Sequence, residues 1–224
     1  MKILLATVPD GPLWSTIESD LLNGGDQTQA NVWMPHGVLR IARFIETKGY
    51  PCDIYDISSL RGSDDEIIKN LKKIKPTVIG LGAGLTHCYP NLKRLSKIIR
   101  KLFPDAWIIT GGAITSSANV ILTKTETDIC VVGDGELPFI KLLEYIDKHP
   151  KHDDFDYDEL SKIKGLGYLK PGNSLNVNGN GEALSASEAS DLHYPDYEVL
   201  NRELEKFSGV PNLVNRFFGT INSL

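Results

Sequence analysis

The sequence has few cysteines, no surplus of positive charge and no long apolar run. Three cysteines are spread over 224 residues, at positions 52, 88 and 130, and thiols inside apolar segments are typical of core packing. The formal net charge is -5, which excludes the extended basic field of a typical nucleic-acid-binding protein. No stretch approaches the roughly 20 apolar residues that a membrane-spanning helix needs. We therefore expect a cytoplasmic protein that binds neither nucleic acid nor membrane.

Short nucleotide-binding motifs are missing too. No Gly-x-Gly-x-x-Gly follows the first strand-like segment and no Walker lysine pattern occurs, so the usual signatures of dinucleotide and nucleoside-triphosphate sites are absent. Two lone histidines, His36 and His87, fall in loop-like segments, where a role as metal ligand or acid–base group is the minority interpretation. We expect no catalytic residue and no metal site in this chain.

The pattern that is present predicts an α/β fold. Hydrophobic residues make up 41% of the sequence, enough for one sizeable core. Strand-like and helix-like segments alternate five times, which predicts a doubly wound, flavodoxin-like (Rossmann-like) sheet of five parallel strands in the order 2-1-3-4-5. The expected strands are 2–8, 52–57, 77–82, 106–110 and 128–132, and the expected helices are 37–48, 63–73, 91–103, 117–125 and 137–148.

The character of the sequence changes after residue 150. Residues 151–159 are mostly charged and predict an exposed segment, so we assign residues 1–150 to the core domain and residues 151–224 to an appendage. Within the appendage, two short apolar runs flank Pro171-Gly172-Asn173 and predict a small β-hairpin. The remainder, residues 184–224, is expected to be a linker around a short helix at 197–207.

Three predicted strands end in small residues at the same edge of the sheet. They run into Gly82-Ala83-Gly84, Gly111-Gly112 and Gly133-Asp134-Gly135-Glu136. Ligands of open α/β sheets bind at the carboxyl ends of such strands, where a bare backbone allows close approach. A structural alternative exists for both features. The glycines would then serve tight turns and helix packing without binding a ligand, and Glu136 would only complement the helix dipole. A long loop, residues 9–36, reaches the same edge and carries Trp14 and Trp33.

Four segments form one ordered pattern: Met34–Ala42, Pro76–Leu81, Gly111–Thr115 and Asp128–Glu136. In this order they resemble the amino-terminal cobalamin-binding domain of cobalamin-dependent radical S-adenosylmethionine (radical SAM) enzymes. That family reads approximately Pro-x-Gly-Leu-x-x-Leu-Ala, an apolar strand ending in glycine, Gly-Gly-x-His-x-Thr, and Asp-x-Val-Val-x-Gly-Glu-Gly-Glu. Ile114 stands in place of the family's histidine and Asp134 in place of a glutamate.

The resemblance implies that this chain binds cobalamin, with the nucleotide tail of the cofactor in the cleft. The implied cofactor-binding residues are Gly82, Ala83, Gly84, Thr86, Gly111, Gly112, Ala113, Thr115, Gly133, Asp134, Gly135 and Glu136. The Asp-x-His-x-x-Gly motif, which supplies a histidine to cobalt in other cobalamin domains, does not follow the first strand. The resemblance therefore implies binding without that histidine.

The resemblance also implies a catalytic half that this chain does not contain. A Cys-x-x-x-Cys-x-x-Cys cluster motif is absent, and three scattered cysteines cannot imitate one. The [4Fe-4S] cluster and S-adenosylmethionine are therefore expected in a radical SAM domain of the same polypeptide, as part of a methyltransferase or a porphyrin-cyclase-like enzyme. Two alternatives stay open: a flavin- or nucleotide-binding flavodoxin-like protein, and a docking domain without a cofactor.

Overall fold

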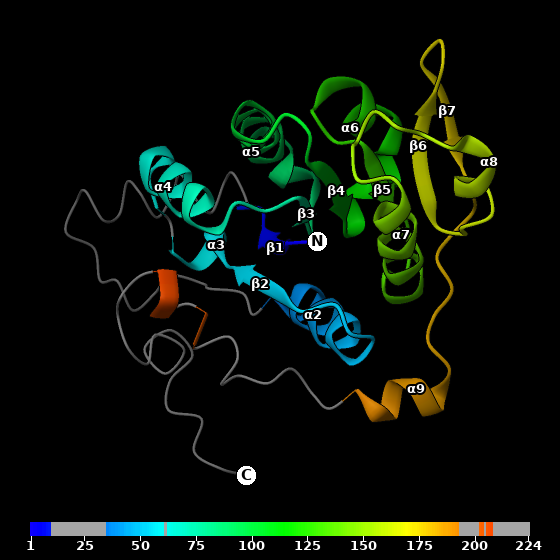
Figure 1. Cartoon of the computed structure of the whole chain (residues 1–224), viewed down its shortest axis with the longest axis horizontal. Coiled ribbons are helices and arrows are strands. Elements are labelled where there is room, and N and C mark those ends of the chain that lie inside the picture. Colours follow the sequence, from blue (N-terminus) through cyan, green and yellow to red (C-terminus); the bar gives the residue numbers. More distant parts are fainter. Residues whose placement is uncertain (10–34, 61, 193–201, 204, 208–224) are drawn as a thin grey trace.

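A seven-stranded sheet forms the centre of the described part of the chain (Figure 1). The computed structural model describes residues 1–9, 35–60, 62–192, 202–203 and 205–207. The strand order is β2-β1-β3-β4-β5-β6-β7, so the predicted order 2-1-3-4-5 of the parallel strands is confirmed. The strands are β1 (Ile3–Thr7), β2 (Cys52–Tyr55), β3 (Val78–Gly82), β4 (Trp107–Gly111), β5 (Ile129–Val131), β6 (Leu166–Lys170) and β7 (Ser174–Val177).

Helices cover both faces of the sheet (Figure 1), as a parallel sheet requires when both of its faces are apolar. One face packs against α2 (His36–Thr47) and α7 (Glu136–Lys148). The other packs against α4 (Asp64–Ile74), α5 (Tyr89–Leu102) and α6 (Ala118–Lys124). Shorter helical turns are α3 (Ile57–Leu60), η2 (Thr86–Cys88), η3 (Ala113–Ser117), α8 (Tyr157–Leu160) and α9 (Ala186–Asp191).

The helix boundaries follow local signals in the sequence. The hydroxyl of Ser63 accepts a hydrogen bond from the Glu66 backbone, and the Glu66 carboxylate accepts one from the Ser63 backbone, which is the capping box that starts a helix. Gly49, with a φ of +87°, follows α2 in the left-handed conformation that glycine adopts without strain. The predicted helix starts and ends therefore agree with the structure to within two residues.

The predicted hairpin forms, but it enlarges the sheet from five strands to seven. Strand β6 pairs antiparallel with β5, so that Cys130 lies opposite Gly167, and β7 pairs antiparallel with β6. Leu166 and Tyr168 are fully buried, which makes the hairpin part of the core. The domain boundary at residue 150 stays a prediction.

The polar segment after α7 is anchored by its aromatic residues. The Phe155 ring lies 5.2 Å from the Trp107 ring, centroid to centroid, and the Trp107 indole donates to the carbonyl of His149 at 2.9 Å. Asp153, Asp154, Asp156 and Asp158 are exposed. The segment is therefore exposed in its charged residues, as predicted, while its rings cover the core.

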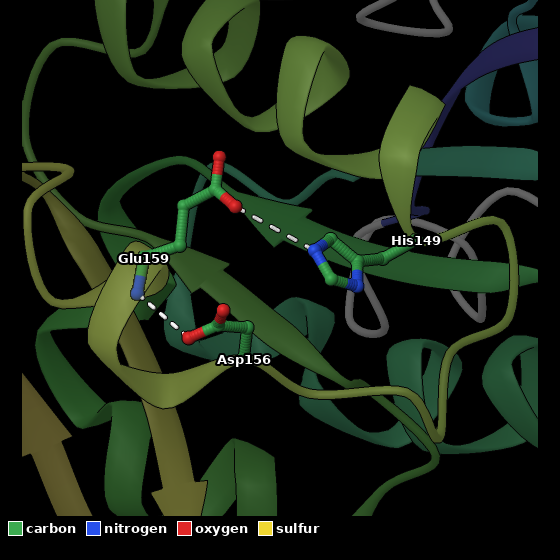
Figure 2. A group of neighbouring side chains, drawn as sticks. All are labelled: His149, Asp156 and Glu159. Carbon is green, nitrogen blue, oxygen red and sulfur yellow. Dashed lines mark hydrogen bonds and ion pairs between the residues drawn. The ribbon is translucent and has the colours of Figure 1, made fainter.

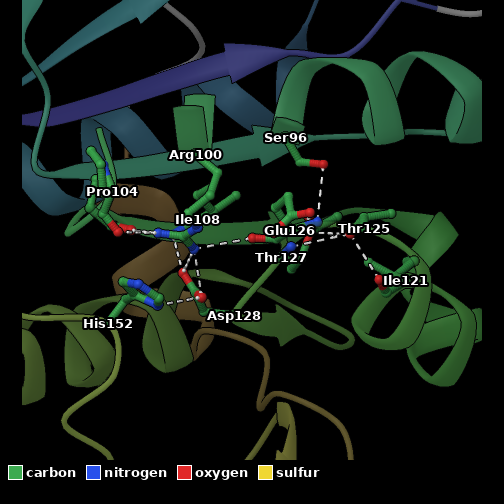
Figure 3. A network of polar contacts seen from close by, with 12 residues as sticks. Ser96, Arg100, Pro104, Ile108, Ile121, Thr125, Glu126, Thr127, Asp128 and His152 are labelled. Atoms are coloured by element: carbon green, nitrogen blue, oxygen red, sulfur yellow. Dashed lines mark hydrogen bonds and ion pairs between the residues drawn. The ribbon is translucent and has the colours of Figure 1, made fainter. Parts of the chain in front are cut away.

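A polar network closes the amino-terminal edge of the sheet (Figure 3). The Asp128 carboxylate accepts two hydrogen bonds from Arg100, at 2.7 and 2.8 Å, and a third from the Ile108 backbone at 2.7 Å. His152 Nδ1 lies 3.0 Å from the same carboxylate. The network joins α5, β4, the start of β5 and the segment after α7.

The last described residues of the chain lie against β2. The Phe207 ring packs on the Tyr55 ring at 4.5 Å, and Lys206 forms an ion pair with Asp53. Residues 202–203 and 205–207 are helical, in line with the predicted short helix; its other residues, and Trp14 and Trp33 of the long loop, lie outside the described residues. No helix in the described part of the chain is long and apolar enough to cross a membrane.

Candidate functional site

A cavity of about 850 Å³ opens at the carboxyl edge of the parallel strands and extends between the sheet and helices α2 and α7. Its floor is one face of four strands, formed by Leu5, Gly80, Ile109 and Val131. Leu5, Gly80 and Ile109 are paired in register across β1, β3 and β4, so they lie side by side. The floor is therefore apolar and continuous.

Gly80 gives the cavity its depth. A Cβ at this position would lie 2.6 Å from Leu5 Cδ2 and 3.5 Å from the Phe139 ring, so any larger residue would occupy space that the cavity shares with Leu5 and Phe139. A glycine inside a strand weakens the strand and often marks a close approach of a ligand or another segment. Here it leaves a slot between the sheet and the two helices.

Two further glycines allow α2 to approach the mouth of this slot. A Cβ on Gly82 would lie 2.6 Å from Val38 Cγ2, and a Cβ on Gly135 would lie 2.8 Å from Ile41 Cδ1. Both distances are shorter than real Cβ contacts. The small residues at the ends of the strands therefore serve helix packing as well as the opening of the cavity.

The loops after β3 and β4 are tied together by their backbones. The Ala83 N–H donates to the Gly111 carbonyl at 3.0 Å, and Gly112 has a φ of +95°. A Cβ on Gly112 would lie only 2.4 Å from the Ala83 carbonyl oxygen. Only glycine fits there, because both the backbone conformation and the close approach exclude a side chain.

The far wall of the cavity is polar and held by a buried carboxyl group. Thr7 Oγ1 donates to Asp56 Oδ1 at 2.7 Å, and Ser59 Oγ donates to Asp56 Oδ2 at 2.5 Å. Burial raises the pKa of Asp56, and the hydrogen bonds from Ser59 and Thr7 oppose that rise. Thr7, Ser58 and Ser59 line the cavity, so Asp56 fixes the wall from behind.

One ion pair spans the two helices at the mouth. Arg40 of α2 pairs through Nε with Oε1 of Glu136, the first residue of α7. The Glu136 side chain is 6% exposed and the Arg40 side chain 50%. Glu136 thus lies in the first turn of α7, where a carboxylate complements the helix dipole, and it also contacts a cationic residue of the cavity wall.

The structure brings most of the sequence-predicted site residues together. Nine line the cavity: Gly82, Ala83, Gly84, Gly111, Gly112, Gly133, Asp134, Gly135 and Glu136. Ala113 and Thr115 line an adjoining hollow of about 600 Å³, which shares Gly112 and Gly133 with the cavity. Thr86 is exposed and lines neither space. The Thr115 hydroxyl donates to the Gly112 carbonyl at 2.7 Å, which gives this residue a structural role in its own loop.

Sequence reasoning missed the slot itself. Its floor and the residues that α2 and α7 contribute, such as Val38, Ile41 and Phe139, look like ordinary core positions in the sequence. One signal was present: Gly80 interrupts an otherwise apolar strand, a pattern that indicates close approach of another group. Of the two histidines considered, His36 lines the cavity and His87 does not.

A second group of potential ligand atoms lies away from the cavity, between the end of α7 and α8 (Figure 2). Atoms of His149, Asp156 and Glu159 lie within 4.8 Å of one another. Each has a partner within the protein: Lys148 pairs with Glu159, the Asp156 carboxylate accepts from two backbone N–H groups of α8, and His149 Nδ1 lies 3.4 Å from Asp154. The group therefore serves as a clamp between α7 and α8.

Comparison with known proteins identifies the family. The model of the B12 binding domain matches residues 27–143, more than half of the chain. The chain belongs to the B12-binding domain family. The match includes α2, the glycine loops after β3, β4 and β5, and most of α7, which all border the cavity; β1, which also lines it, lies outside the match. Cobalamin is the cofactor of this domain.

Two curated proteins match part of this chain. Cytidylyl-2-hydroxyethylphosphonate methyltransferase of Streptomyces wedmorensis is 26% identical in an alignment of 138 residues, which covers 54% of this chain and 26% of the methyltransferase. The uncharacterized protein MJ1620 of Methanocaldococcus jannaschii is 34% identical over 105 residues, 47% of this chain and 18% of that protein. The chain thus matches about a quarter or less of the length of these relatives.

Solved structures share the fold. The radical S-adenosylmethionine methyltransferase TsrM of Kitasatospora setae, with cobalamin and a [4Fe-4S] cluster bound, aligns with a TM-score of 0.60 at 16% identity and covers 83% of this chain and 30% of its own. The cobalamin-dependent S-adenosylmethionine radical enzyme OxsB aligns with a TM-score of 0.53 at 15% identity. The alignment covers 82% of this chain and 22% of OxsB. Identities this low establish the fold alone.

The cavity of the B12-binding domain suits the chemistry of cobalamin. Cobalamin combines a wide corrin ring with a tail that carries a flat aromatic base. The slot offers an apolar floor at Leu5, Ile109 and Val131, and Gly80 adds depth. The mouth is bare backbone at Gly111 and Gly112, which a wide ring can approach closely. The residues present therefore fit the group.

Proposed function

We propose that this chain is the cofactor-binding part of a cobalamin-dependent radical SAM enzyme, a methyltransferase or a porphyrin-cyclase-like enzyme. The observation that carries the proposal is the slot between the sheet and helices α2 and α7, opening at the glycine-rich edge. The family match and the fold shared with TsrM support it. The twelve residues from Gly82 to Glu136 named from the sequence remain the proposed cofactor contacts, together with the floor and walls of the slot.

The residues of this chain have three tasks in the proposed mechanism. The apolar floor around Gly80 holds the base of the tail out of water, which favours binding through the burial of apolar surface. The backbone at Gly111, Gly112 and Gly133 seats the ring, and the tied loops keep that seat in one shape. When bound, cobalamin supplies a cobalt centre that carries methyl groups or takes part in radical chemistry.

We also propose that cobalt receives no histidine ligand from this chain. The Asp-x-His-x-x-Gly motif does not follow β1, and among the described residues that line the cavity the one histidine is His36, an exposed residue at the start of α2. The visible spectrum of bound cobalamin should therefore be the same in the wild type and in His36→Ala. A spectral shift in the variant would show instead that His36 is a ligand.

Reconstitution tests the proposed cofactor. The purified chain is incubated with hydroxocobalamin and passed through a gel-filtration column, and the corrinoid that stays with the protein is measured from its visible spectrum. We expect retention near one equivalent per chain. A parallel incubation with FMN tests the alternative: retention of the flavin without the corrinoid would contradict our proposal and favour a flavodoxin-like role. Retention of neither would favour a docking domain.

A cavity-filling variant shows whether the slot is the site. In Val38→Phe the added ring would enter the cavity that Val38 lines, so we expect cobalamin affinity to fall by about tenfold or more, since about 1.4 kcal/mol of lost contact is a factor of ten. Val120→Phe is the matched control, because Val120 is 46% exposed on α6 and lies outside the cavity. Equal affinity in the two variants would show that cobalamin binds elsewhere.

The proposed partner is a radical SAM domain of the same polypeptide, in the cytoplasm. Its support is the size of the solved relatives, of which this chain covers 30% and 22%. The coding sequence around this chain tests the proposal: a Cys-x-x-x-Cys-x-x-Cys motif is expected in the same reading frame, because three such thiolates hold the cluster. A complete gene without that motif would contradict it.

A further inference from the structure

One cationic side chain is found among the described residues that line the cavity. Among the described residues of its wall, Arg40 is the only lysine or arginine. It lies on α2, one turn after His36, and its side chain is half exposed. The rest of the described lining is mainly apolar side chains, hydroxyls and glycine backbone, together with the carboxylates of Asp134 and Glu136 and the imidazole of His36. A guanidinium at the mouth of a mainly apolar slot points to an anionic group on the ligand.

Glu136 fixes the position of this guanidinium. The Glu136 side chain is 6% exposed, and a buried carboxylate needs a partner. The ion pair uses Nε of Arg40. An arginine carries five N–H donors in a planar fork, so Nε can pair with the carboxylate while the terminal nitrogens face a second anion. The pair therefore holds Arg40 between α2 and α7, where the slot opens.

The chemistry of the cofactor supplies one matching anion. The peripheral groups of the corrin ring in cobalamin are neutral amides and methyl groups, whereas the loop that joins the ring to the base contains one phosphodiester. Arginine pairs well with phosphate, because its fork matches two phosphate oxygens. We propose that Arg40, positioned by Glu136, binds the phosphodiester of the nucleotide loop and selects corrinoids that carry it. This inference rests on the proposed function.

A purely structural role for the pair makes a different prediction. If Arg40 only clamps α2 to α7, its loss would weaken the binding of every corrinoid to the same degree. If Arg40 recognises the phosphodiester, its loss would weaken only corrinoids that carry the phosphate. Cobinamide has the same corrin ring but lacks the phosphate, ribose and base, and cobinamide phosphate restores the phosphate alone. The three ligands thus separate the two roles.

The experiment measures the dissociation constants of the dicyano forms of cobalamin, cobinamide phosphate and cobinamide by fluorescence quenching. Arg40→Met is compared with the wild type and with Arg43→Met. Arg43 lies on the same helix, is also 50% exposed and pairs with Glu46, but it does not line the cavity. In Arg40→Met we expect about five- to tenfold weaker binding of both phosphate-bearing ligands, as for the loss of one charge-assisted contact. The affinity of Arg40→Met for cobinamide should differ from that of the wild type by less than about twofold. The affinities of Arg43→Met for all three ligands should also stay within about twofold.

A second variant covers the case in which Arg40→Met does not fold. The double variant Arg40→Met with Glu136→Gln removes both charges and leaves no buried carboxylate unpaired, and it should show the same discrimination. Equal weakening of all three ligands, or no weakening, would overturn the role of Arg40 while the wild type still bound cobalamin. Failure of the wild type to retain any of the three corrinoids would overturn the proposed function and this inference with it.

Discussion

The two edges of the sheet are built in opposite ways. At the carboxyl edge, glycine loops leave the backbone bare around a cavity, and Gly112 and Gly133 have φ values of +95° and +84°. At the amino edge, polar side chains bind one another: Arg100 donates to Asp128, which also accepts from the Ile108 backbone. The carboxyl edge leaves the glycine backbone open to a ligand, while the amino edge is closed by polar side chains that bind one another.

The difference teaches that binding and stability are located in different parts of one fold. The amino edge orders the strands through contacts that no ligand shares, so changes there should lower the free energy of unfolding and leave ligand affinity alone. The carboxyl edge holds its loops with few side chains, so changes there should alter affinity first. Substitutions at each edge, taken from the largest expected effect to the smallest, test this separation.

Asp128→Ala should have the largest effect on stability. The Asp128 side chain is 10% exposed and Arg100 17%, so the substitution leaves a partly buried guanidinium without its carboxylate. Removing one partner of a buried pair costs about 3 to 5 kcal/mol, and we expect about 3 kcal/mol here because the pair keeps some solvent contact. Urea denaturation measures the loss. Cobalamin affinity of the folded protein should stay within about twofold of the wild type.

Asp105→Ala is the control for this substitution. Asp105 is an exposed carboxylate before β4, near the same edge, and its replacement should change the free energy of unfolding by less than about 0.5 kcal/mol. A large loss of cobalamin affinity in Asp128→Ala, with no such loss in Asp105→Ala, would contradict the separation of the two edges.

The sequence predicts the parallel sheet and the glycine edge well, for physical reasons that lie within short segments. Strand β4 and the Gly111-Gly112 turn that ends it are visible locally, as is the Ser63 capping box. The slot cannot be predicted from local sequence, because it depends on the position of Gly80 between Leu5 and Ile109, which belong to two other strands. The Arg40–Glu136 pair joins residues that are far apart in the chain, and no local pattern predicts it.

The hairpin shows the same limit. Its turn at Pro171-Gly172-Asn173 is a local signal, and Asn173 and Gly172 have positive φ values as such turns require. The pairing of the hairpin with β5 depends on contacts between segments that are distant in the sequence, because Leu166 and Tyr168 are buried against the core. The contact between the rings of Phe155 and Trp107 was not predicted either, because Phe155 lies among charged residues in the sequence.

Gly112→Ala should be the most costly change at the carboxyl edge. The Cβ would lie 2.4 Å from the Ala83 carbonyl oxygen, in a backbone conformation that alanine rarely adopts, so the loops after β3 and β4 must separate. We expect a loss of about 2 kcal/mol of stability from strain and about tenfold weaker cobalamin binding. Urea denaturation and cobalamin titration measure the two effects. Wild-type affinity in this variant would show that the loop seats no cofactor.

Gly111→Ala should separate binding from stability at the same edge. A Cβ on Gly111 would meet no atom within 4 Å, so the free energy of unfolding should change by less than about 0.5 kcal/mol. The methyl group would project into the space assigned to the cofactor, and cobalamin affinity should fall by about five- to tenfold. Gly167→Ala is the control, because its Cβ would lie 3.5 Å from Cys130 Cβ, at ordinary contact distance and outside the cavity. Equal affinities in the two variants would contradict the assignment.

His152→Gln should have the smallest effect, which depends on pH. The hydrogen bond with Asp128 raises the pKa of His152, and burial and Arg100 oppose that rise. Because the folded-state pKa is the higher one, protonated His152 stabilises the fold fully below its unfolded pKa of about 6.5, and this contribution is lost as the pH rises through the folded value. We expect the free energy of unfolding of the wild type to exceed that of His152→Gln by roughly 0.5 kcal/mol at about pH 6 and by less at about pH 8, measured by urea denaturation at each pH. Lys151→Gln, at the exposed position just before His152, should show no such pH-dependent difference. Cobalamin affinity should be unchanged in both variants at each pH, because His152 lies at the amino edge of the sheet and does not line the cavity.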